Sequence, residues 1–223
     1  MEDRAALLEE YHRTEVVDCE RCPLYRTRTQ VVLGNGDPNA DLMFVGEAPG
    51  YHEDRIGVPF VGQAGKLLDR LLAGIGLSRE DVFVANVLKC RPPGNRDPLG
   101  DEIESCEPHL FRQVSLIRPR VVCTLGNFAT KLLSGRPEGI SRVHGHELPM
   151  QVGDLPVLLY PIYHPAAALY TPAMLATLEH DFARLPELLG REAPGAAPAA
   201  PEPERELAGA APASARAEQL GLF

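Results

Sequence analysis

Four short apolar runs alternate with stretches of helical spacing, and this alternation constrains the fold more than any other feature of the chain. The runs are LMFVGE (residues 42–47), VFVANVL (82–88), RVVCTLG (120–126) and VLLYPIYH (157–164). Runs this short that are apolar on both faces are typical of strands covered by helices on both sides. We therefore predict an α/β fold with a central four-stranded parallel sheet. Helices are expected over about residues 5–13, 63–73, 100–116 and 172–188, with a further one ending near residue 133.

Length and composition limit the class of protein. A chain of 223 residues has room for one α/β domain and an extension. No apolar run approaches the ~20 residues that cross a bilayer, and the first residues are charged rather than typical of a signal peptide. We expect a soluble, cytoplasmic protein, monomeric and with no membrane partner.

The composition changes after Leu189. Residues 190–218 are mostly Ala, Pro, Gly and Glu, which supply almost nothing for a core and predict a disordered linker. Three large apolar side chains then return in QLGLF, the last five residues. The chain is therefore divided into a folded domain (1–189), a linker (190–218) and a terminal peptide (219–223).

Polar side chains stand at the ends of three apolar runs. Glu47 follows the first, Asn86 lies in the second, and His164 ends the fourth. Because open α/β sheets bind ligands beyond the carboxyl ends of their strands, these groups should converge there. Each alone has an ordinary explanation, as part of a Gly-Pro turn, a backbone cap or a structural histidine. Together they offer a base or water-orienting group, an amide for reading a heterocycle, and a donor for a developing anion.

An aromatic side chain lies in the glycine- and proline-rich loop between the first run and its helix. In GVPFVGQAG, Phe60 either packs beneath the loop or offers its ring to a planar base. The sequence leaves both interpretations open.

The five cysteines indicate metal or thiol chemistry, because disulfides are rare in a reducing compartment. Cys19 and Cys22 form a C-x2-C pair, while Cys90 and Cys106 lie far downstream. Four thiolates can hold an iron–sulfur cluster or a structural zinc ion, and the spacing leaves both open. Cys123 lies inside an apolar run and is predicted to be a small core residue.

The net charge of −9 argues against a nucleic-acid partner, but the charge is unevenly distributed. Residues 89–146 carry 9 Lys and Arg against 6 Asp and Glu. This block is either an ordinary solvated surface or the source of phosphate contacts. Its cationic candidates are Lys89, Arg91, Arg96, Arg118, Arg120, Lys131, Arg136 and Arg142.

Several motifs together resemble a known family. GEAPG (46–50), GVPFVGQAG (57–65), NVLKCRPPGNRDP (86–98), HPAAAL (164–169) and the four cysteines outside the apolar runs are similar to those of the iron–sulfur, family-4 uracil-DNA glycosylases. The resemblance spans about residues 14–189 and implies a three-layer α/β/α sandwich. It also implies a DNA-repair hydrolase of base excision repair, acting at the nucleoid, with a [4Fe–4S] cluster. The cluster ligands would be Cys19, Cys22, Cys90 and Cys106.

The resemblance implies how the base would be held. Uracil is flipped out of the DNA, because its glycosidic bond cannot be reached inside the helix. The ring would stack on Phe60, while the Asn86 amide pairs with its O4 and N3–H. The backbone at Gly46 and Ala48 would close the pocket, and Glu53 would line it and help to reject thymine.

The resemblance also implies the catalytic groups and one departure. Glu47 would orient or activate the attacking water, and His164 would donate to uracil O2. Leu169 is the expected wedge that fills the gap left by the flipped base. Relatives often carry an arginine nearby, whereas this chain has Tyr170, which makes single-stranded DNA a candidate substrate beside duplex DNA.

The terminal QLGLF resembles the short peptide by which bacterial repair and replication proteins bind the DNA sliding clamp. Leu222 and Phe223 would fill an apolar pocket on the clamp, with Gln219 and Leu220 beside them. A coil of this linker's length spans about 30 Å, enough for the domain to search DNA while tethered.

Two other classes of function remain. One is a non-catalytic iron–sulfur, DNA-binding or clamp-tethered module of the same fold, which the joint presence of Glu47, Asn86 and His164 disfavours. The other is a nucleotide-binding enzyme using GNGDPNAD (34–41), but that stretch lacks the Gly-Lys-Ser/Thr of a phosphate-binding loop.

Overall fold

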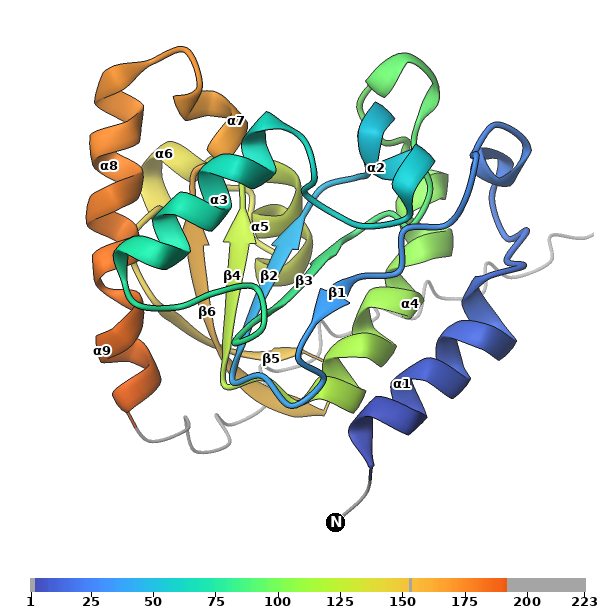
Figure 1. Cartoon of the computed structure of the whole chain (residues 1–223), viewed down its shortest axis with the longest axis horizontal. Helices are drawn as coiled ribbons and strands as arrows, with labels where there is room; N and C mark the ends of the chain where they lie inside the picture. The colour runs from blue at the N-terminus through green and yellow to red at the C-terminus, as the bar shows by residue number, and fades with distance from the viewer. Residues whose placement is uncertain (1–2, 153, 192–223) are drawn as a thin grey trace, which may run out of the picture.

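One mixed six-stranded sheet, with the strand order β1-β3-β2-β4-β6-β5, runs through the molecule (Figure 1). The computed structural model describes residues 3–152 and 154–191. The predicted parallel strands are confirmed as the four central ones. They are β3 (Phe83–Asn86), β2 (Leu42–Gly46), β4 (Val121–Leu125) and β6 (Leu155–Ile162).

The predicted count of four strands is wrong for the sheet as a whole, because each edge carries an additional antiparallel strand. β1 (Asn35–Gly36) pairs with β3, and β5 (Leu148–Val152) pairs with β6. β1 has two residues, one of them glycine, while β5 contains Pro149 and is only partly buried. Strands that contain glycine or proline are usually found at the edges of sheets. Because neither β1 nor β5 is a continuous apolar run, the sequence pattern did not reveal them.

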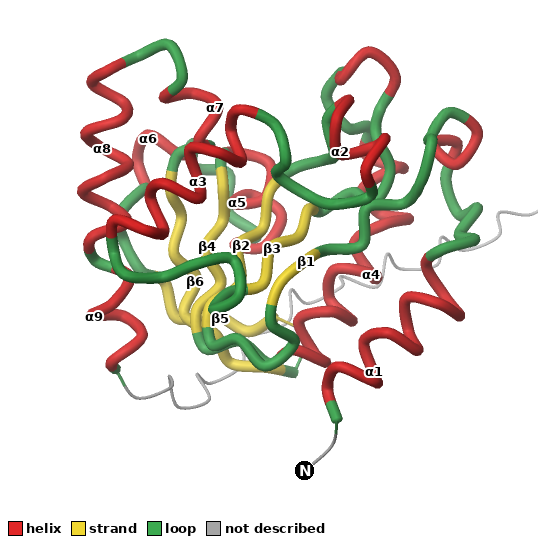
Figure 2. Tube along the Cα trace, viewed as in Figure 1, coloured by secondary structure: helices red, strands yellow, loops and turns green. Residues whose placement is uncertain are grey.

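Helices cover both faces of the sheet, which confirms the three-layer α/β/α architecture (Figure 2). One layer contains α1 (Arg4–Tyr11), α4 (Gly100–Ile117) and α5 (Asn127–Ser134). The other contains α3 (Gln63–Gly74), α8 (Pro172–Ala183) and α9 (Leu185–Gly190). Shorter elements are α2 (Tyr51–Ile56), α6 (Ile140–Val143), α7 (Pro165–Ala168), a π-helical turn (His12–Val16) and 3-10 turns (Pro23–Arg26 and Pro93–Asn95).

The first apolar run shows why the two layers form. Met43 and Val45 pack into the core shared with α4 and α5, while Leu42 and Phe44 pack into the core shared with α3 and α8. All four side chains are at most 1% exposed. Burying each such side chain contributes about 1.5–3 kcal/mol, so this strand is fixed from both sides.

The last predicted helix, 172–188, is divided into α8 and α9. Pro186 lies in the first turn of α9 and has no backbone N–H to donate to a carbonyl of the preceding turn. The chain therefore begins a new helix after Arg184 rather than continuing the old one.

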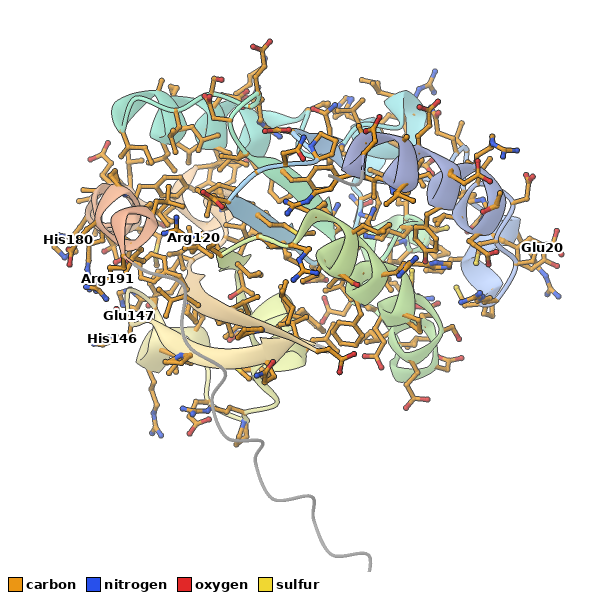
Figure 3. The ribbon with its side chains drawn as sticks, turned by 90° about the horizontal axis from the view of Figure 1, so that it is seen from below. Glu20, Arg120, His146, Glu147, His180 and Arg191 are labelled. Carbon is orange, nitrogen blue, oxygen red and sulfur yellow. The ribbon has the colours of Figure 1, made fainter. Side chains whose placement is uncertain are left out.

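The end of the folded part is fastened to the start of β4. Arg120 donates to the backbone carbonyls of Leu189 and Arg191, and the Arg191 guanidinium lies 2.7 Å from Glu147. Figure 3 shows Arg120, Glu147 and Arg191 together beside the last helix. Because Arg120 directly precedes β4, residue 191 lies at the amino-terminal edge of the parallel strands.

Two further expectations concern membrane-spanning helices and the C-terminal segments. None of the helices in residues 3–152 and 154–191 has the length and apolarity to cross a bilayer. Apart from Gly190 and Arg191, the proposed linker 190–218 and the peptide 219–223 lie outside the described residues.

Candidate active site

The polar residues predicted at the strand ends meet in one cavity of about 420 Å³ at the carboxyl edge of the sheet. β2, β3, β6 and the loops that follow them build its walls. Its lining residues are Glu47, Ala48, Pro49, Gly50, Glu53, Phe60, Ala64, Asn86, Pro92, Asn95, Arg96, His164 and Ala166. The predicted convergence of Glu47, Asn86 and His164 is therefore observed.

Gly46, the last residue of β2, is required by its neighbours rather than by a turn. In the parallel register it lies beside Asn86. A Cβ on Gly46 would stand 2.4 Å from Asn86 Oδ1 and 2.7 Å from Phe60 Cζ. Both distances are much shorter than a van der Waals contact, so any side chain here would displace the Asn86 amide and the Phe60 ring that line the cavity.

Asn86 ends β3 with its side chain in the cavity and is 3% exposed. Within the described part of the chain, no protein group hydrogen-bonds its carboxamide. Its backbone carbonyl accepts from the buried Lys89 Nζ at 2.7 Å. A buried amide whose backbone is fixed and whose side chain has no protein partner is arranged to bond a ligand.

Phe60 is held in an unusual backbone conformation above the cavity. Its φ is 55°, the left-handed region that residues other than glycine rarely adopt. Arg79 Nη2 donates to the Phe60 carbonyl at 2.9 Å, and a Cβ on Gly65 would collide with that carbonyl. Such strain is maintained where the surroundings fix a functional geometry. The Phe60 ring lies 5.5 Å from the His164 ring, tilted by 25°.

His164 forms the N-cap of α7, and this contact determines its tautomer. The backbone N–H of Ala166 donates to Nδ1 at 3.1 Å. Burial lowers the pKa of the imidazole to about 4, and the nearby Glu53 carboxylate opposes this only in part. The ring is therefore neutral near pH 7, and because Nδ1 accepts a hydrogen bond, its proton resides on Nε2.

Glu47 is a half-buried carboxylate directly after β2. Burial raises its pKa above the ordinary glutamate value, and the charge of Asp97 raises it further. No hydrogen bond to its side-chain oxygens occurs among the described residues. Glu47 therefore lines the cavity as an acceptor of elevated basicity.

Glu53 organises the loop that carries Phe60. Its Oε1 accepts from the backbone N–H groups of Val61 and Gly62, both at 3.1 Å. Its Oε2 lies where a side chain on Gly50 would have to be, 2.7 Å from the position of a Cβ. Glu53 lines the cavity as predicted and, in addition, fixes the turn after Phe60.

Two residues of the site, Asn95 and Arg79, were not singled out by the sequence, whereas Arg96 was already a cationic candidate for phosphate contacts. Asn95 and Arg96 line the cavity, and Arg96 forms two hydrogen bonds with the buried Glu102, at 2.5 and 2.9 Å. Arg79 supports Phe60 from a distant turn. The dense motif after β3 contained the signal for Asn95 and Arg96, whereas nothing local to Arg79 predicted its contact.

The four cysteines predicted as ligands line one cavity next to α4. Their sulfurs receive hydrogen bonds from Lys89 N to Cys106 at 3.2 Å and from Arg28 to Cys90 at 3.4 Å, and His109 Nε2 lies 3.3 Å from Cys19. Burial raises the pKa of the Cys106 thiol to about 11.

Cysteine thiolates are a donor set that both iron–sulfur clusters and zinc ions use. In residues 3–152 and 154–191, no group of three or more His, Cys, Asp or Glu side chains is placed close enough together to hold a metal ion. Polar N–H groups directed at the sulfurs are the usual surroundings of an iron–sulfur cluster. Cys123, by contrast, is fully buried in β4, as predicted.

The loop after α7 places its two large side chains differently. Leu169, the predicted wedge, is half-buried and packs against the core beside α3 and α8. Tyr170 is 90% exposed. The side chain that this loop offers to solvent is therefore Tyr170.

The family model of the uracil-DNA glycosylase superfamily matches residues 33–187, more than half of the chain. The chain therefore belongs to the uracil-DNA glycosylase superfamily.

Curated relatives show to which group of the superfamily the chain belongs. A type-4 uracil-DNA glycosylase of Saccharolobus solfataricus is 48% identical over 180 residues, 78% of this chain and 83% of that protein. One from Archaeoglobus fulgidus is 47% identical over 184 residues, 81% and 92% of the two chains. A type-5 uracil-DNA glycosylase of Thermus thermophilus is 33% identical over 117 residues, 46% and 53% of the two chains. Within the superfamily, the chain is a member of the type-4 uracil-DNA glycosylases.

Proposed function

We propose that this chain is a uracil-DNA glycosylase of base excision repair, which hydrolyses the N-glycosidic bond of uracil in DNA and leaves an abasic site. The observation that carries the mechanism is the meeting of three groups in one cavity: the Glu47 carboxylate, the unpartnered Asn86 amide and the neutral His164 imidazole. A single nucleobase fits beside them once it has been flipped out of the DNA.

Base recognition rests on Phe60 and Asn86. The ring of Phe60 provides the stacking surface, and the Asn86 amide can accept from N3–H and donate to O4 of uracil. Cytosine presents the opposite pattern at these two atoms, so an amide in this orientation would face a donor with its N–H group and an acceptor with its oxygen. Gly46 keeps the space beside the amide open, because a side chain there would occupy it.

The bond is broken by water, with two protein groups dividing the work. Glu47 accepts a proton from the water as its oxygen bonds to C1′, and the raised pKa makes this carboxylate a better base. The C1′–N1 bond breaks and its electron pair leaves with the base. His164 Nε2–H donates to uracil O2 as negative charge accumulates there. The products are the abasic sugar and the uracil anion, which takes up a proton from water, and Glu47 returns its own proton to the solvent.

The test uses labelled single-stranded oligonucleotides that contain one uracil, thymine or hypoxanthine, followed by alkali to cut at abasic sites. Cleavage at uracil alone is expected, and Glu47→Gln should cleave at uracil about 10²- to 10³-fold more slowly. If the parent protein leaves all three strands intact while it binds DNA, the non-catalytic module becomes the correct class.

The four cysteines are proposed to hold a [4Fe–4S] cluster. The convergence of Cys19, Cys22, Cys90 and Cys106, the hydrogen-bond donors around them and the family resemblance support it. When bound, the cluster would tie the N-terminal segment to the β3 loop and α4. Protein purified without oxygen should be brown and contain iron and sulfide in equal amounts, whereas Cys106→Ser should lose iron. A colourless, iron-free parent protein would contradict the assignment.

The cysteine site is connected through Lys89 to the backbone of Asn86, the residue that carries the proposed base-reading amide. This side chain is 1% exposed and donates to the Asn86 carbonyl at 2.7 Å and to Gln113 Oε1 at 2.5 Å, while its backbone N–H bonds Cys106. The proposed cluster ligands and the proposed uracil reader therefore share one buried residue. This supports a structural role for the cluster near the site.

For the wedge, the sequence assignment of Leu169 is retained as a proposal, with Tyr170 as the exposed neighbour. Replacing each by alanine and comparing uracil excision from single and double strands separates them. Loss on duplex DNA alone identifies the wedge, since single strands leave no gap to fill.

The terminal peptide is proposed to bind the sliding clamp through Gln219, Leu220, Leu222 and Phe223. Residue 191 lies at the sheet edge opposite the cavity, so a tether that starts there leaves the cavity mouth accessible. Deleting residues 219–223 should abolish co-elution with the clamp. If the intact chain and clamp do not co-elute, this assignment is wrong.

A further inference from the structure

A cluster of one tyrosine and two arginines lies at the rim of the cavity. Tyr51 is the first residue of α2 and is 47% exposed, and the preceding Gly50 lines the cavity. The Arg55 guanidinium carbon lies 5.6 Å from the centre of the Tyr51 ring, and that of Arg91 lies 5.2 Å from it. These contacts are within the range of cation–π attraction, so the ring holds both cations near it.

The loop after β3, which lines another side of the cavity, also holds this cluster in place. Arg91 Nε donates to Asn95 Oδ1 at 2.5 Å, and Asn95 lines the cavity. Arg55 Nη1 lies 3.1 Å from the Tyr51 hydroxyl. The two guanidinium groups are therefore positioned by the loops that also shape the cavity.

The charge of this cluster is not neutralised within the described residues. No carboxylate lies within salt-bridge distance of Arg55 or Arg91 there, whereas Arg79, Arg96 and Arg191 each pair with one. The whole chain carries a net charge of −9. Two uncompensated cations beside the cavity mouth of an acidic protein provide a local site for anions.

We propose that Tyr51, Arg55 and Arg91 bind the unpaired DNA strand next to the flipped uridine. The guanidinium groups contact phosphates that flank the uridine, and the exposed part of the Tyr51 ring stacks on a neighbouring base. Strands without base pairing are bound by this combination of cations and aromatic rings, which requires no particular sequence. This inference rests on the proposed function and identifies how its substrate is held outside the base pocket.

The test measures binding as well as catalysis, with the full-length protein. Tyr51→Ala, Arg55→Ala and Arg91→Ala are compared with Arg118→Asn. Arg118 was one of the cationic candidates of the sequence, but it is an exposed residue between α4 and β4, at the edge of the sheet opposite the cavity, and this position removes it from the candidates for phosphate contact there. Its φ of 52° is one that asparagine tolerates. Fluorescence anisotropy gives the Kd for a labelled uracil-free single strand over a range of salt concentrations. Thermal unfolding verifies that each variant is folded.

The expected results differ between the ring and the cations. Tyr51→Ala should weaken binding about 5- to 100-fold, the effect of losing one stacked base. Each arginine replacement should reduce the slope of log K against log salt by about 0.7, the value for one phosphate contact on a single strand. For uracil-containing strands, the loss should appear in KM rather than in the single-turnover rate at saturation. Arg118→Asn should match the parent.

Two results would overturn the inference. The first is a set of folded variants that bind the uracil-free strand as Arg118→Asn does, with unchanged salt slopes. The second is weaker binding of duplex DNA with unchanged binding of single strands. A parent that excises no uracil would refute the proposed function instead, because the anisotropy measurement needs no excision.

Discussion

The protonation state of His164 decides how the leaving base is stabilised, and burial favours the neutral ring. With a pKa of about 4, only a very small fraction of the molecules carries an imidazolium near pH 7.5. An imidazolium mechanism would therefore operate through a very small fraction of the protein. The neutral ring, with Nδ1 occupied by the Ala166 N–H, presents Nε2–H in essentially every molecule.

The informative substitution is His164→Asn. Asparagine is a good N-cap residue, so it keeps an acceptor for the Ala166 N–H at the start of α7. It removes the ring and the Nε2–H donor. By comparison with other donors to a developing anion, the rate should fall about 10²- to 10³-fold, or about 2.7–4 kcal/mol of transition-state stabilisation. The melting temperature should change little by comparison.

The assay is single-turnover excision from a uracil-containing single strand between about pH 4.5 and 9. The parent rate should rise with pH as Glu47 loses its proton and then stay level, because His164 has already lost its own. His164→Asn should keep this shape at a lower plateau. A parent rate that falls about tenfold per pH unit above neutrality would refute the reasoning, because it would require the imidazolium.

Three further predictions concern the residues around His164. Glu47→Gln should lower the excision rate about 10²- to 10³-fold. It should also unfold at a higher temperature at neutral pH, because the raised folded-state pKa means that the ionised carboxylate opposes folding; this gain in melting temperature should vanish below the ordinary glutamate pKa, where the parent is protonated as well. Gly46→Ala should lower the free energy of unfolding by about 1–3 kcal/mol, because its Cβ displaces Asn86 and Phe60. Since both of these residues line the cavity, kcat/KM should fall by more than the loss of stability alone explains. An unchanged kcat/KM would contradict the packing argument. Arg79→Ala leaves the Phe60 carbonyl without its hydrogen-bond donor. In urea unfolding the free energy of unfolding should fall by about 1–3 kcal/mol, and KM should rise. An unchanged KM would show that the loop holds Phe60 in place without Arg79.

The parallel strands were predictable because their signal is local. Each of β2, β3, β4 and β6 is a short apolar run, and burial on both faces leaves no other arrangement for it. The antiparallel edges were missed because β1 is two residues long and β5 contains a proline. Their pairing depends on which backbone lies alongside, and no local pattern records that.

The division of the last helix has the same explanation. The apolar periodicity of residues 172–188 continues across the break, so the pattern predicts one helix. Pro186 interrupts the helix because it has no backbone N–H to donate to the preceding turn. In the first turn of a new helix, α9, that N–H is not needed. A proline within an otherwise periodic stretch was therefore the more reliable signal.

The sequence by itself determined which chemical groups the site contains. Glu47, Asn86 and His164 lie at or just after the ends of strands that meet at one edge, and four cysteines outside the apolar runs indicate a site for either an iron–sulfur cluster or a zinc ion. These conclusions depend on residue type and order along the chain, which the sequence states directly.

Only the tertiary structure decided how those groups behave. The neutral tautomer of His164 depends on burial and on one backbone N–H, and the need for Gly46 depends on Asn86 and Phe60, which are brought to it from other segments. The strained Phe60 is held by Arg79, nineteen residues away, and the exposed member of the last loop is Tyr170 rather than Leu169. Protonation, close packing and exposure are set by neighbours that are distant in sequence, and those neighbours exist only after the chain has folded.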